Sequence, residues 1–302
     1  MDLDPTPDQA GLLDALSKLT APFAAQPAGA ARDFLVSADL ENRLTESGFR
    51  DVAKADGMGV LEAVLLTEAV AALPYVTEFA ASAIVAPKLG ISAGRPTVLM
   101  CQPLDAPVRF LTGAGTALIE DGNDVRVMNL TGQEVEVLTA PFGYPLGRLC
   151  STDLGGERIT GAATMLRQWW YVALAAEIGA VARAAVDLTV QYVKDRQQFG
   201  RAIGSYQAVQ HRLSECSVAV EAIRQLTRRA AATEDLQDAL IAASYAKEAC
   251  ARVIYDTQQF HGAIGVTYEY PLHLWTYRLR LLQGELGSLA DTASALAEAR
   301  WG

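Results

Sequence analysis

One stretch of the sequence combines residue types that could grip a phosphate-bearing cofactor. It reads Arg196-Gln-Gln-Phe199-Gly200 and lies between two long apolar runs. A guanidinium is permanently charged and can form two parallel hydrogen bonds with a diphosphate, an aromatic ring offers a flat face, and glycine allows close backbone approach. The same pattern can also mark a helix end with a glycine cap and a surface arginine, so the stretch alone leaves both interpretations open.

A second stretch, about sixty residues further along the chain, favours the cofactor interpretation. Gln259 supplies an amide side chain, and the small residues Gly262 and Ala263 follow at a spacing suited to backbone contact with an adenosine diphosphate. Together the two stretches resemble the Arg-x-x-Phe-Gly and Gln-x-x-Gly-Gly-x-Gly motifs of acyl-CoA dehydrogenases, in the same order. Ala263 departs from the family's second glycine, which weakens the expectation of close backbone contact at that position.

The resemblance implies FAD as cofactor and a defined reaction. In acyl-CoA dehydrogenases a carboxylate removes the α-proton of an acyl-CoA thioester while flavin N5 accepts the β-hydrogen as hydride. Carried over position by position, the resemblance implies FAD contacts from Arg196, Gln198, Phe199, Ile203, Gln207, Gln259, Gly262 and Ala263.

The family places its catalytic base at one of two positions, and neither holds a carboxylate in this sequence. The commoner position falls on Gly287 and the other on Trp169. Glu285 lies two residues before Gly287, but two helical steps rotate a side chain by about 200°, so we expect a solvated helix carboxylate there. Trp169 and the adjacent Trp170 are expected to fill the bundle or an interface.

The loops that hold the flavin ring in active family members are also missing. The corresponding region is short and reads Met100-Cys-Gln-Pro-Leu-Asp-Ala-Pro, and no tryptophan precedes Trp169. In the family's homo-oligomers the two motifs reach across a dimer interface to a neighbour's flavin. The chain therefore resembles the short subunits of heteromeric α2β2 acyl-CoA dehydrogenases of actinobacterial steroid catabolism, in which a longer partner carries the base. We expect the chain alone to be inactive and to share FAD with that partner.

The hydrophobic patterning predicts a mainly α chain with a small antiparallel β domain, and this order of elements resembles the acyl-CoA dehydrogenase fold. An N-terminal helical domain is expected over residues 1–95, a reduced β domain over 96–161 and a C-terminal four-helix bundle over 162–302. The predicted strands are Thr97–Cys101, Thr116–Ile119, Asp124–Met128 and Glu134–Leu138, with a hairpin turn at 120–124. The predicted long helices cover about 163–194, 205–232, 235–264 and 270–286, besides an earlier one that ends at Pro74.

Bulk properties exclude several classes of function. The 302 residues are 51% hydrophobic and carry a net charge of -10 without a basic run, which argues against nucleic acid and anionic membranes as partners. No apolar stretch is long enough to span a bilayer, and the acidic start differs from a signal peptide, so a cytoplasmic protein is expected. The scattered cysteines, expected to be reduced and buried, are Cys101, Cys150, Cys216 and Cys250.

The three histidines add little to the cofactor argument. His211 and His273 fall in helical patterns and are expected at the surface or an interface, whereas His261 lies inside the second motif and could contact the cofactor. Their spacing suggests no metal site.

Two alternatives to the heteromeric subunit remain open. One is a scaffold or binding protein that kept the fold and lost the flavin, and the other is a self-sufficient dehydrogenase with an unrecognised base. The apolar runs 169–176 and 239–245 exceed what one bundle core should absorb, so we expect them to form a face for a partner.

Overall fold

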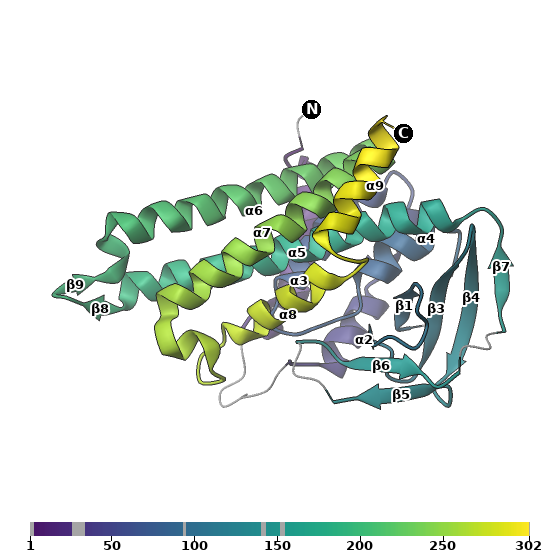
Figure 1. Cartoon of the computed structure of the whole chain (residues 1–302), viewed down its shortest axis with the longest axis horizontal. Coiled ribbons are helices and arrows are strands. Elements are labelled where there is room, and N and C mark those ends of the chain that lie inside the picture. The colour runs from purple at the N-terminus through teal and green to yellow at the C-terminus, as the bar shows by residue number, and fades with distance from the viewer. Residues whose placement is uncertain (1–2, 26–33, 93–94, 140–142, 152–154, 302) are drawn as a thin grey trace.

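The computed structural model describes residues 3–25, 34–92, 95–139, 143–151 and 155–301, and its elements follow in the order helices, strands, helices (Figure 1). The amino-terminal helical segments are α1 (Pro7–Thr20), η1 (Ala21–Phe23), α2 (Ala38–Glu46), η2 (Phe49–Lys54), α3 (Val60–Ala71), η3 (Ala81–Val85) and α4 (Ala86–Lys88). Helix α1 begins where its sequence indicates, because Thr6 and Gln9 cap one another's backbone N–H groups and Pro7 occupies the first turn.

Helix α3 is apolar almost all round, and the fold buries it accordingly. Glu62 accepts a hydrogen bond from the Gly59 N–H at 2.7 Å, which caps the start of the helix, and another from Gln9 Nε2 at 2.7 Å, which ties α1 to α3. The predicted helix before Pro74 is thus confirmed, ending at Ala71.

The strands form two small sheets. The first has the order β1-β3-β4-β7, the second β2-β6-β5, and a separate pair β8-β9 lies among the C-terminal helices. Their bounds are β1 (Thr97–Met100), β2 (Val108–Arg109), β3 (Ala114–Asp121), β4 (Asp124–Thr131), β5 (Val135–Leu138), β6 (Leu146–Leu149), β7 (Glu157–Ile159), β8 (Gln197–Gln198) and β9 (Arg201–Ala202). All four predicted strands are present, and the predicted hairpin turn joins β3 to β4.

The pairing of β1 with β3 differs from the antiparallel sheet that the sequence suggested. Thr97 faces Thr116 and Met100 faces Ile119 in a parallel register, because β2 and the loops around it intervene and return the chain to run in the same direction. The short strands β2, β6 and β7 were not predicted, since two to four residues carry too little alternation to recognise.

The C-terminal helices pack around α5. Their bounds are α5 (Ala163–Asp195), η4 (Ile203–Ser205), α6 (Gln207–Thr233), α7 (Leu236–His261), η5 (Gly262–Val266), α8 (His273–Gly284) and α9 (Leu289–Trp301). The fourth predicted helix stops early and a separate α9 follows, because Leu286 and Gly287 adopt left-handed backbone with φ of 58° and 86°.

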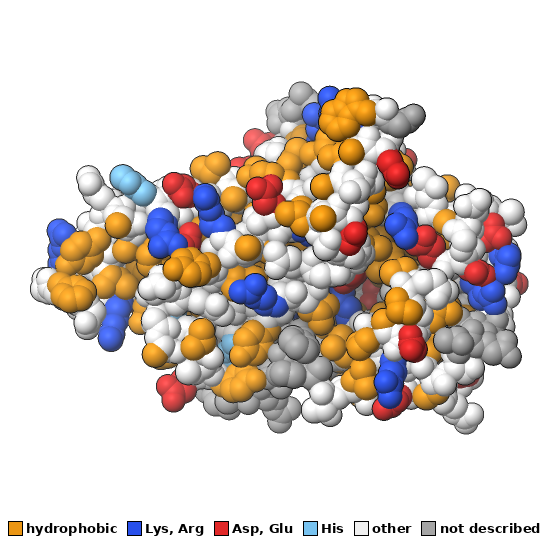
Figure 2. Space-filling view, in the orientation of Figure 1, with side chains coloured by type: hydrophobic (Ala, Val, Ile, Leu, Met, Phe, Trp, Pro, Cys, Tyr) orange, Lys and Arg blue, Asp and Glu red, His pale blue; other side chains and the backbone are white. Residues whose placement is uncertain are grey.

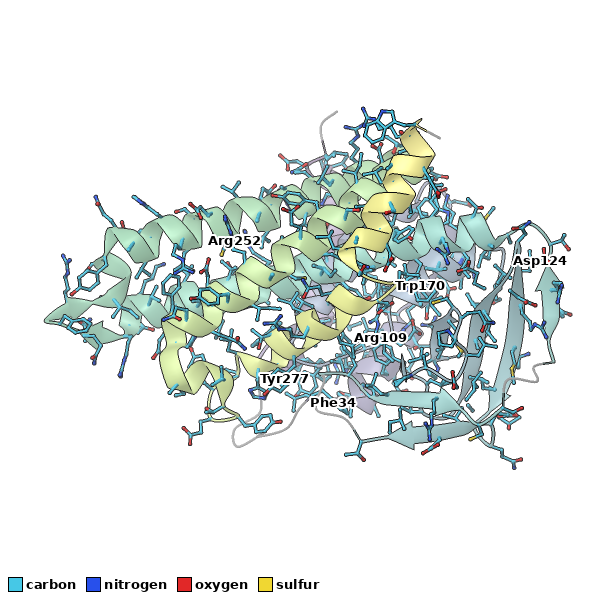
Figure 3. All side chains as sticks on the ribbon, in the orientation of Figure 1. Phe34, Arg109, Asp124, Trp170, Arg252 and Tyr277 are labelled. Carbon is cyan, nitrogen blue, oxygen red and sulfur yellow. The ribbon has the colours of Figure 1, made fainter. Side chains whose placement is uncertain are left out.

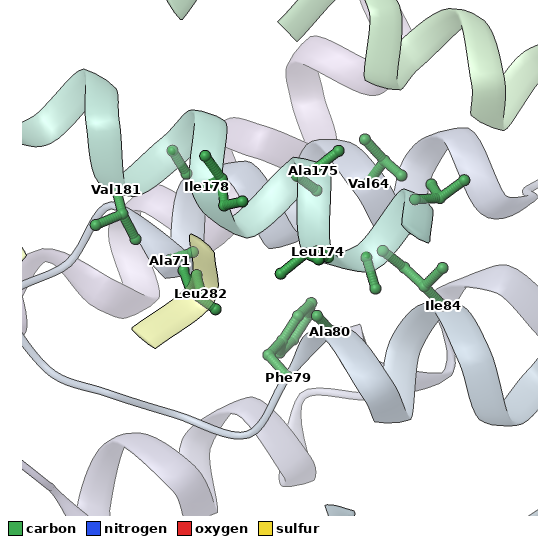
Figure 4. Packing of buried hydrophobic residues seen from close by; sticks show 14 of the residues in the cluster. Val64, Ala71, Phe79, Ala80, Ile84, Leu174, Ala175, Ile178, Val181 and Leu282 are labelled. Atoms are coloured by element: carbon green, nitrogen blue, oxygen red, sulfur yellow. The ribbon is translucent and has the colours of Figure 1, made fainter. Parts of the chain in front are cut away.

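Helix α5 is the central element and packs against α3, η3, α6, α7 and α8. Figure 4 shows its residues Leu174 and Ile178 among Ile84 of η3, Leu282 of α8, and Phe79, which lies just before η3. The run 169–176 is buried within the chain, as is most of 239–243. The expectation of a face for a partner is therefore wrong for 169–176 and for the buried part of 239–245, because α3 and η3 cover α5 and α9 packs on α7. Ile241, Ser244 and Tyr245 are half-buried.

Two expectations about single side chains also fail. His273 is fully buried, and its Nδ1 lies 2.8 Å from the Tyr270 carbonyl oxygen, whereas a surface or interface position was expected. Cys150 is exposed and Cys101 half-buried, and the other two cysteines are buried as expected. Within the described residues, no helix has both the length and the apolar character needed to cross a membrane.

Candidate functional site

The first motif forms a hairpin at one end of the bundle. Helix α5 ends at Asp195, and Gln197 and Gln198 then pair with Ala202 and Arg201. Phe199 and Gly200 make the two-residue turn with φ of 55° and 82°. Positive φ at both central positions is the pattern of a type I′ turn, which matches the twist of a hairpin. Gly200 is thus a turn residue and not a helix cap.

The turn gives Phe199 a backbone conformation and a solvent exposure that are both unfavourable in the isolated chain. A non-glycine residue in left-handed backbone costs about 1–2 kcal/mol, and the Phe199 side chain is 89% exposed. Arg196, three residues earlier, is exposed and forms no ion pair within the described part of the chain. By contrast, the Arg201 guanidinium lies 4.0 Å from the centre of the Tyr206 ring. The hairpin therefore presents an exposed aromatic ring and a cation that has no ion-pair partner among the described residues.

Three further residues of the first motif lie close to the hairpin. Ile203 is half-buried and its N–H donates to the Arg196 carbonyl at 2.9 Å, closing the hairpin. Gln198 is exposed on β8, and Gln207 is exposed at the first position of α6.

The second motif ends α7 at the same end of the bundle (Figure 1). Gln259 is exposed, and Gly262 ends the helix with a φ of 65° that favours glycine. Ala263 is also exposed. Figure 1 shows the loop after α7 lying below the hairpin, so the two motifs share one end of the molecule.

An aromatic cluster joins the two motifs. The His261 ring on α7 stacks on Tyr192 of α5, with ring centres 4.2 Å apart, and Tyr270 lies 4.8 Å from His261. Burial lowers the pKa of His261, opposed by the hydrogen bond between its Nδ1 and the Thr257 carbonyl. The ring is therefore neutral at pH 7 and is buried in this cluster, behind the exposed residues of the two motifs.

A cavity of about 530 Å³ lies far from the hairpin, between the strands and the helices η3, α5 and α8. Figure 2 shows this face hollowed between the C-terminal helices and the strands. Its walls are mainly apolar and include Phe79, Leu99, Met100, Leu146, Trp170 and Leu281. Exposed residues such as Gln102, Arg280 and Gly284 stand at its rim, so the cavity opens to solvent.

One arginine and two glutamates form a buried ionic cluster in this cavity, hereafter the ionic triad. Arg109 donates to both oxygens of Glu177 at 2.9 and 2.6 Å, and to Glu285 at 2.6 and 3.2 Å. The three side chains are only 13%, 5% and 12% exposed. Trp170 Nε1 donates to Glu285 Oε1 at 2.5 Å. Figure 3 shows Arg109 and Trp170 close together beside the end of α8.

Each member of the ionic triad is placed by its element. Trp170 and Glu177 are seven residues apart on α5, which is two helical turns and therefore the same face. Arg109 ends β2 and Glu285 follows the last residue of α8. Burial lowers the pKa of Arg109, but the two carboxylates outweigh burial and hold that pKa well above its ordinary range. The guanidinium therefore stays charged, as a buried cation with two anionic partners must.

Glu285 is not the solvated helix carboxylate that the sequence suggested. Helix α8 ends at Gly284, and Glu285 has extended backbone with ψ of 140°, so the helical rotation does not apply to it. Its side chain points into the cavity and both oxygens accept hydrogen bonds. Gly287 also lines the cavity and Trp169 is buried, with Lys88 Nζ 4.5 Å from its ring centre.

Arg109 and Glu177 were not predicted as site residues from the sequence. A signal existed for Glu177, because it interrupts the apolar run between Val172 and Val181 at a position facing the core. Arg109 gave none, since it lies in a two-residue strand. Among the described residues, no group of three or more His, Cys, Asp or Glu side chains could hold a metal ion.

Comparison with known proteins supports the predicted resemblance. Residues 168–298 match the family described as "Acyl-CoA dehydrogenase, C-terminal domain". "Acyl-CoA dehydrogenase IpdE2" of Mycolicibacterium smegmatis is 39% identical over 132 residues, which is 43% of this chain and 42% of that protein. The matched segments thus span less than half the length of this curated relative.

Solved structures match over nearly the whole chain. A variant of the "Tcur3481-Tcur3483 steroid ACAD" has a TM-score of 0.78 at 22% identity, covering 96% of this chain and 97% of the other. The "ChsE4-ChsE5 complex from Mycobacterium tuberculosis" has a TM-score of 0.74 at 20% identity, covering 100% of both chains. At these identities the likeness shows the fold, and the predicted acyl-CoA dehydrogenase fold is confirmed.

Proposed function

We propose that this chain, which belongs to the acyl-CoA dehydrogenase family through its C-terminal domain and fold, is one subunit of a heteromeric FAD-dependent acyl-CoA dehydrogenase. A longer partner holds the flavin ring and the catalytic base, and two copies of each chain form the enzyme. The substrate is an acyl-CoA thioester derived from a steroid. The two similar structures named as a steroid ACAD and as a two-chain complex support this proposal.

The hairpin is the observation that carries the proposal. Arg196 offers a cation without an acidic partner in the described residues, and Phe199 offers an aromatic face in costly left-handed backbone. Residual strain and exposure at one point are expected where a partner or ligand completes the contact. Gln259 and Gly262 lie at the same end of the bundle, so one extended cofactor could reach both motifs.

The residues fit one arm of FAD and not its reactive ring. Arg196 would hold the diphosphate by charge-assisted hydrogen bonds, and Phe199 would pack on the cofactor's flat surface. Gln259 and the exposed backbone at Gly262 and Ala263 would contact the adenosine diphosphate end. When bound, the flavin supplies the hydride acceptor for α,β-dehydrogenation.

Among the described residues that line the cavity, each carboxylate already accepts hydrogen bonds, so none is a free base. Both oxygens of Glu285 accept hydrogen bonds from Arg109 or Trp170, and Gly287 has no side chain. We therefore expect the isolated chain to bind no stoichiometric FAD and to dehydrogenate no acyl-CoA. Isolated chain with about one equivalent of flavin and measurable turnover would contradict the proposal.

Substitution of Arg196 tests directly whether the hairpin contributes to FAD binding. In the complex co-purified with its partner, Arg196→Ala should leave assembly intact and weaken FAD retention by about ten- to a hundred-fold, the loss expected for a charge-assisted hydrogen bond. Arg196→Lys should restore only part, because an ammonium keeps the charge and lacks the planar fork. Flavin absorbance after dialysis gives the occupancy.

Arg252→Ala is the matched control. Arg252 is 57% exposed on α7 and pairs with Glu215 at 3.1 Å, so its loss removes an exposed cation elsewhere on the bundle. FAD occupancy equal in all three variants and in the wild type would refute a cofactor role for the hairpin and favour a scaffold that has lost the flavin.

One observation favours a second candidate, a self-sufficient dehydrogenase. Glu285 lies in a cavity two residues before the position at which the family's base is expected. This candidate predicts that the isolated chain is yellow, that it reduces its flavin with acyl-CoA, and that Glu285→Gln abolishes the reduction. A colourless isolated chain would exclude it.

A further inference from the structure

The cavity that contains the ionic triad has features of a ligand site in its own right. Its volume of about 530 Å³ lies within the range of small-molecule sites, and apolar side chains form most of its walls. Phe79 and Met100 are 2% and 0% exposed, so the inner wall is fixed in the core. The exposed rim at Gln102, Arg280 and Gly284 leaves a way in from solvent.

The backbone is strained next to two triad members. Phe110 directly follows Arg109 with φ of 62°, and Leu286 directly follows Glu285 with φ of 58°, and both line the cavity. Left-handed backbone at bulky residues is uncommon and persists where the surrounding structure requires it, often at ligand sites. These two backbone conformations direct the side chains of Arg109, on β2, and Glu285, after α8, toward one another. The backbone therefore fixes the positions of the charged groups at the polar end of the cavity.

The unused hydrogen-bonding capacity of this polar end is mostly acceptor capacity. Arg109 makes four hydrogen bonds to the two carboxylates, and the one Trp170 N–H donates to Glu285. A carboxylate has about four lone-pair directions, so Glu177 and Glu285 together can accept further hydrogen bonds. A carbonyl or carboxylate group on a ligand is itself an acceptor and would face these carboxylate oxygens. The triad has only one side-chain donor left to offer such a group, a single guanidinium N–H of Arg109.

From this arrangement we propose that the cavity binds a mostly apolar molecule bearing a hydroxyl group, which donates a hydrogen bond to Glu285 or Glu177. The apolar body lies against Phe79, Met100 and Trp170. The ligand is neutral, because Arg109 already balances one carboxylate and the exposed Arg280 at the rim opposes a second cation. The cavity site is separate from the proposed FAD contacts at the hairpin, which lie at the far end of α5.

Three ring compounds of the same skeleton test the chemistry: cyclododecanol, cyclododecanone and cyclododecanecarboxylate. Titration calorimetry on the full chain should show the alcohol binding about ten-fold or more tightly than the ketone, since a hydrogen bond to a charged acceptor is at stake. The carboxylate should bind most weakly, because it meets two like charges. A ketone that binds as tightly as the alcohol, a carboxylate that binds most tightly, or no binding by any of them would overturn the proposal.

The variant Glu285→Gln locates the site. The amide keeps the shape and an acceptor for Trp170 while adding N–H donors, so the preference for alcohol over ketone should fall towards one. Glu298→Gln, the same change at an exposed position on α9, should leave the preference intact. An unchanged preference in Glu285→Gln with a normal melting curve would also overturn the proposal. Because the wild-type order of the three compounds is an independent measurement, the test does not depend on the variant folding.

Discussion

Replacing Arg109 by methionine should destabilise the protein more than any exposed arginine does. The change keeps the side chain's length and removes four hydrogen bonds to Glu177 and Glu285, whose side chains are 5% and 12% exposed. Breaking a buried ion pair on one side typically costs 3–5 kcal/mol, since it leaves an uncompensated charge. The cavity admits some solvent, so we expect the lower end, about 3 kcal/mol.

Thermal melting of the purified chain measures this loss. A chain of this size should lose roughly 2 °C per kcal/mol, so the melting temperature should fall by roughly 6 °C at pH 8.

Two companion variants make the reasoning refutable. Arg148→Met breaks an exposed pair with Glu136, whose members are 48% and 50% exposed, and should change stability by less than about 1 kcal/mol. The triple variant Arg109→Met, Glu177→Met, Glu285→Gln removes all three charges, keeps an acceptor for Trp170, and should recover most of the lost stability. If Arg109→Met melts no lower than Arg148→Met, the ionic triad contributes no more to the free energy of unfolding than an exposed ion pair, which would refute the predicted cost.

Three further outcomes follow from single positions. Gly287→Glu should not install a base, because φ is 86° and a Cβ there would lie 2.8 Å from Asp291 Oδ2; we expect a loss of about 1–2 kcal/mol in stability and no flavin reduction by acyl-CoA in the isolated chain. Phe199→Asn should stabilise the chain by about 1 kcal/mol, because Asn-Gly suits a type I′ turn, yet it should lower FAD retention in the complex; a melting curve and a flavin count check the two effects separately. Iodoacetamide at pH 8 should modify Cys150 and spare Cys250, as peptide mass spectrometry would show, because Cys150 is exposed whereas burial raises the pKa of Cys250 to about 12.

The fold was largely predictable because its long elements carry strong patterns. The helices α5, α6 and α7 were predicted to within a few residues, since apolar positions recur over seven or more turns. The strands β3 and β4 were recognised by alternation and by the turn at Gly122. The parallel pairing of β1 with β3 was missed, because pairing direction depends on how intervening loops return and not on the strands themselves.

The cavity site was harder to predict than the hairpin. The hairpin residues are neighbours in sequence, so their combination was visible in one window. Arg109, Glu177 and Glu285 come from β2, α5 and the end of α8, and only the tertiary structure brings them together. The position of Glu285 was misjudged for a local reason: the helix was extended by two residues too many, and a helix boundary is where pattern reasoning is weakest.

The number of residues in helix α5 fixes the position of the hairpin relative to the cavity. It carries Trp170 and Glu177 in the cavity and leads without interruption to Arg196 at the hairpin, about 40 Å from Trp170 at 1.5 Å per residue. Loss of one residue between Glu177 and Arg196 would turn the hairpin by about 100° relative to the cavity, whereas a change of seven residues would turn it by only about 20°. Single insertions or deletions are therefore tolerable in the loops and not in α5, and the helix can change length only in steps of about two turns, with α6 and α7 extended to match.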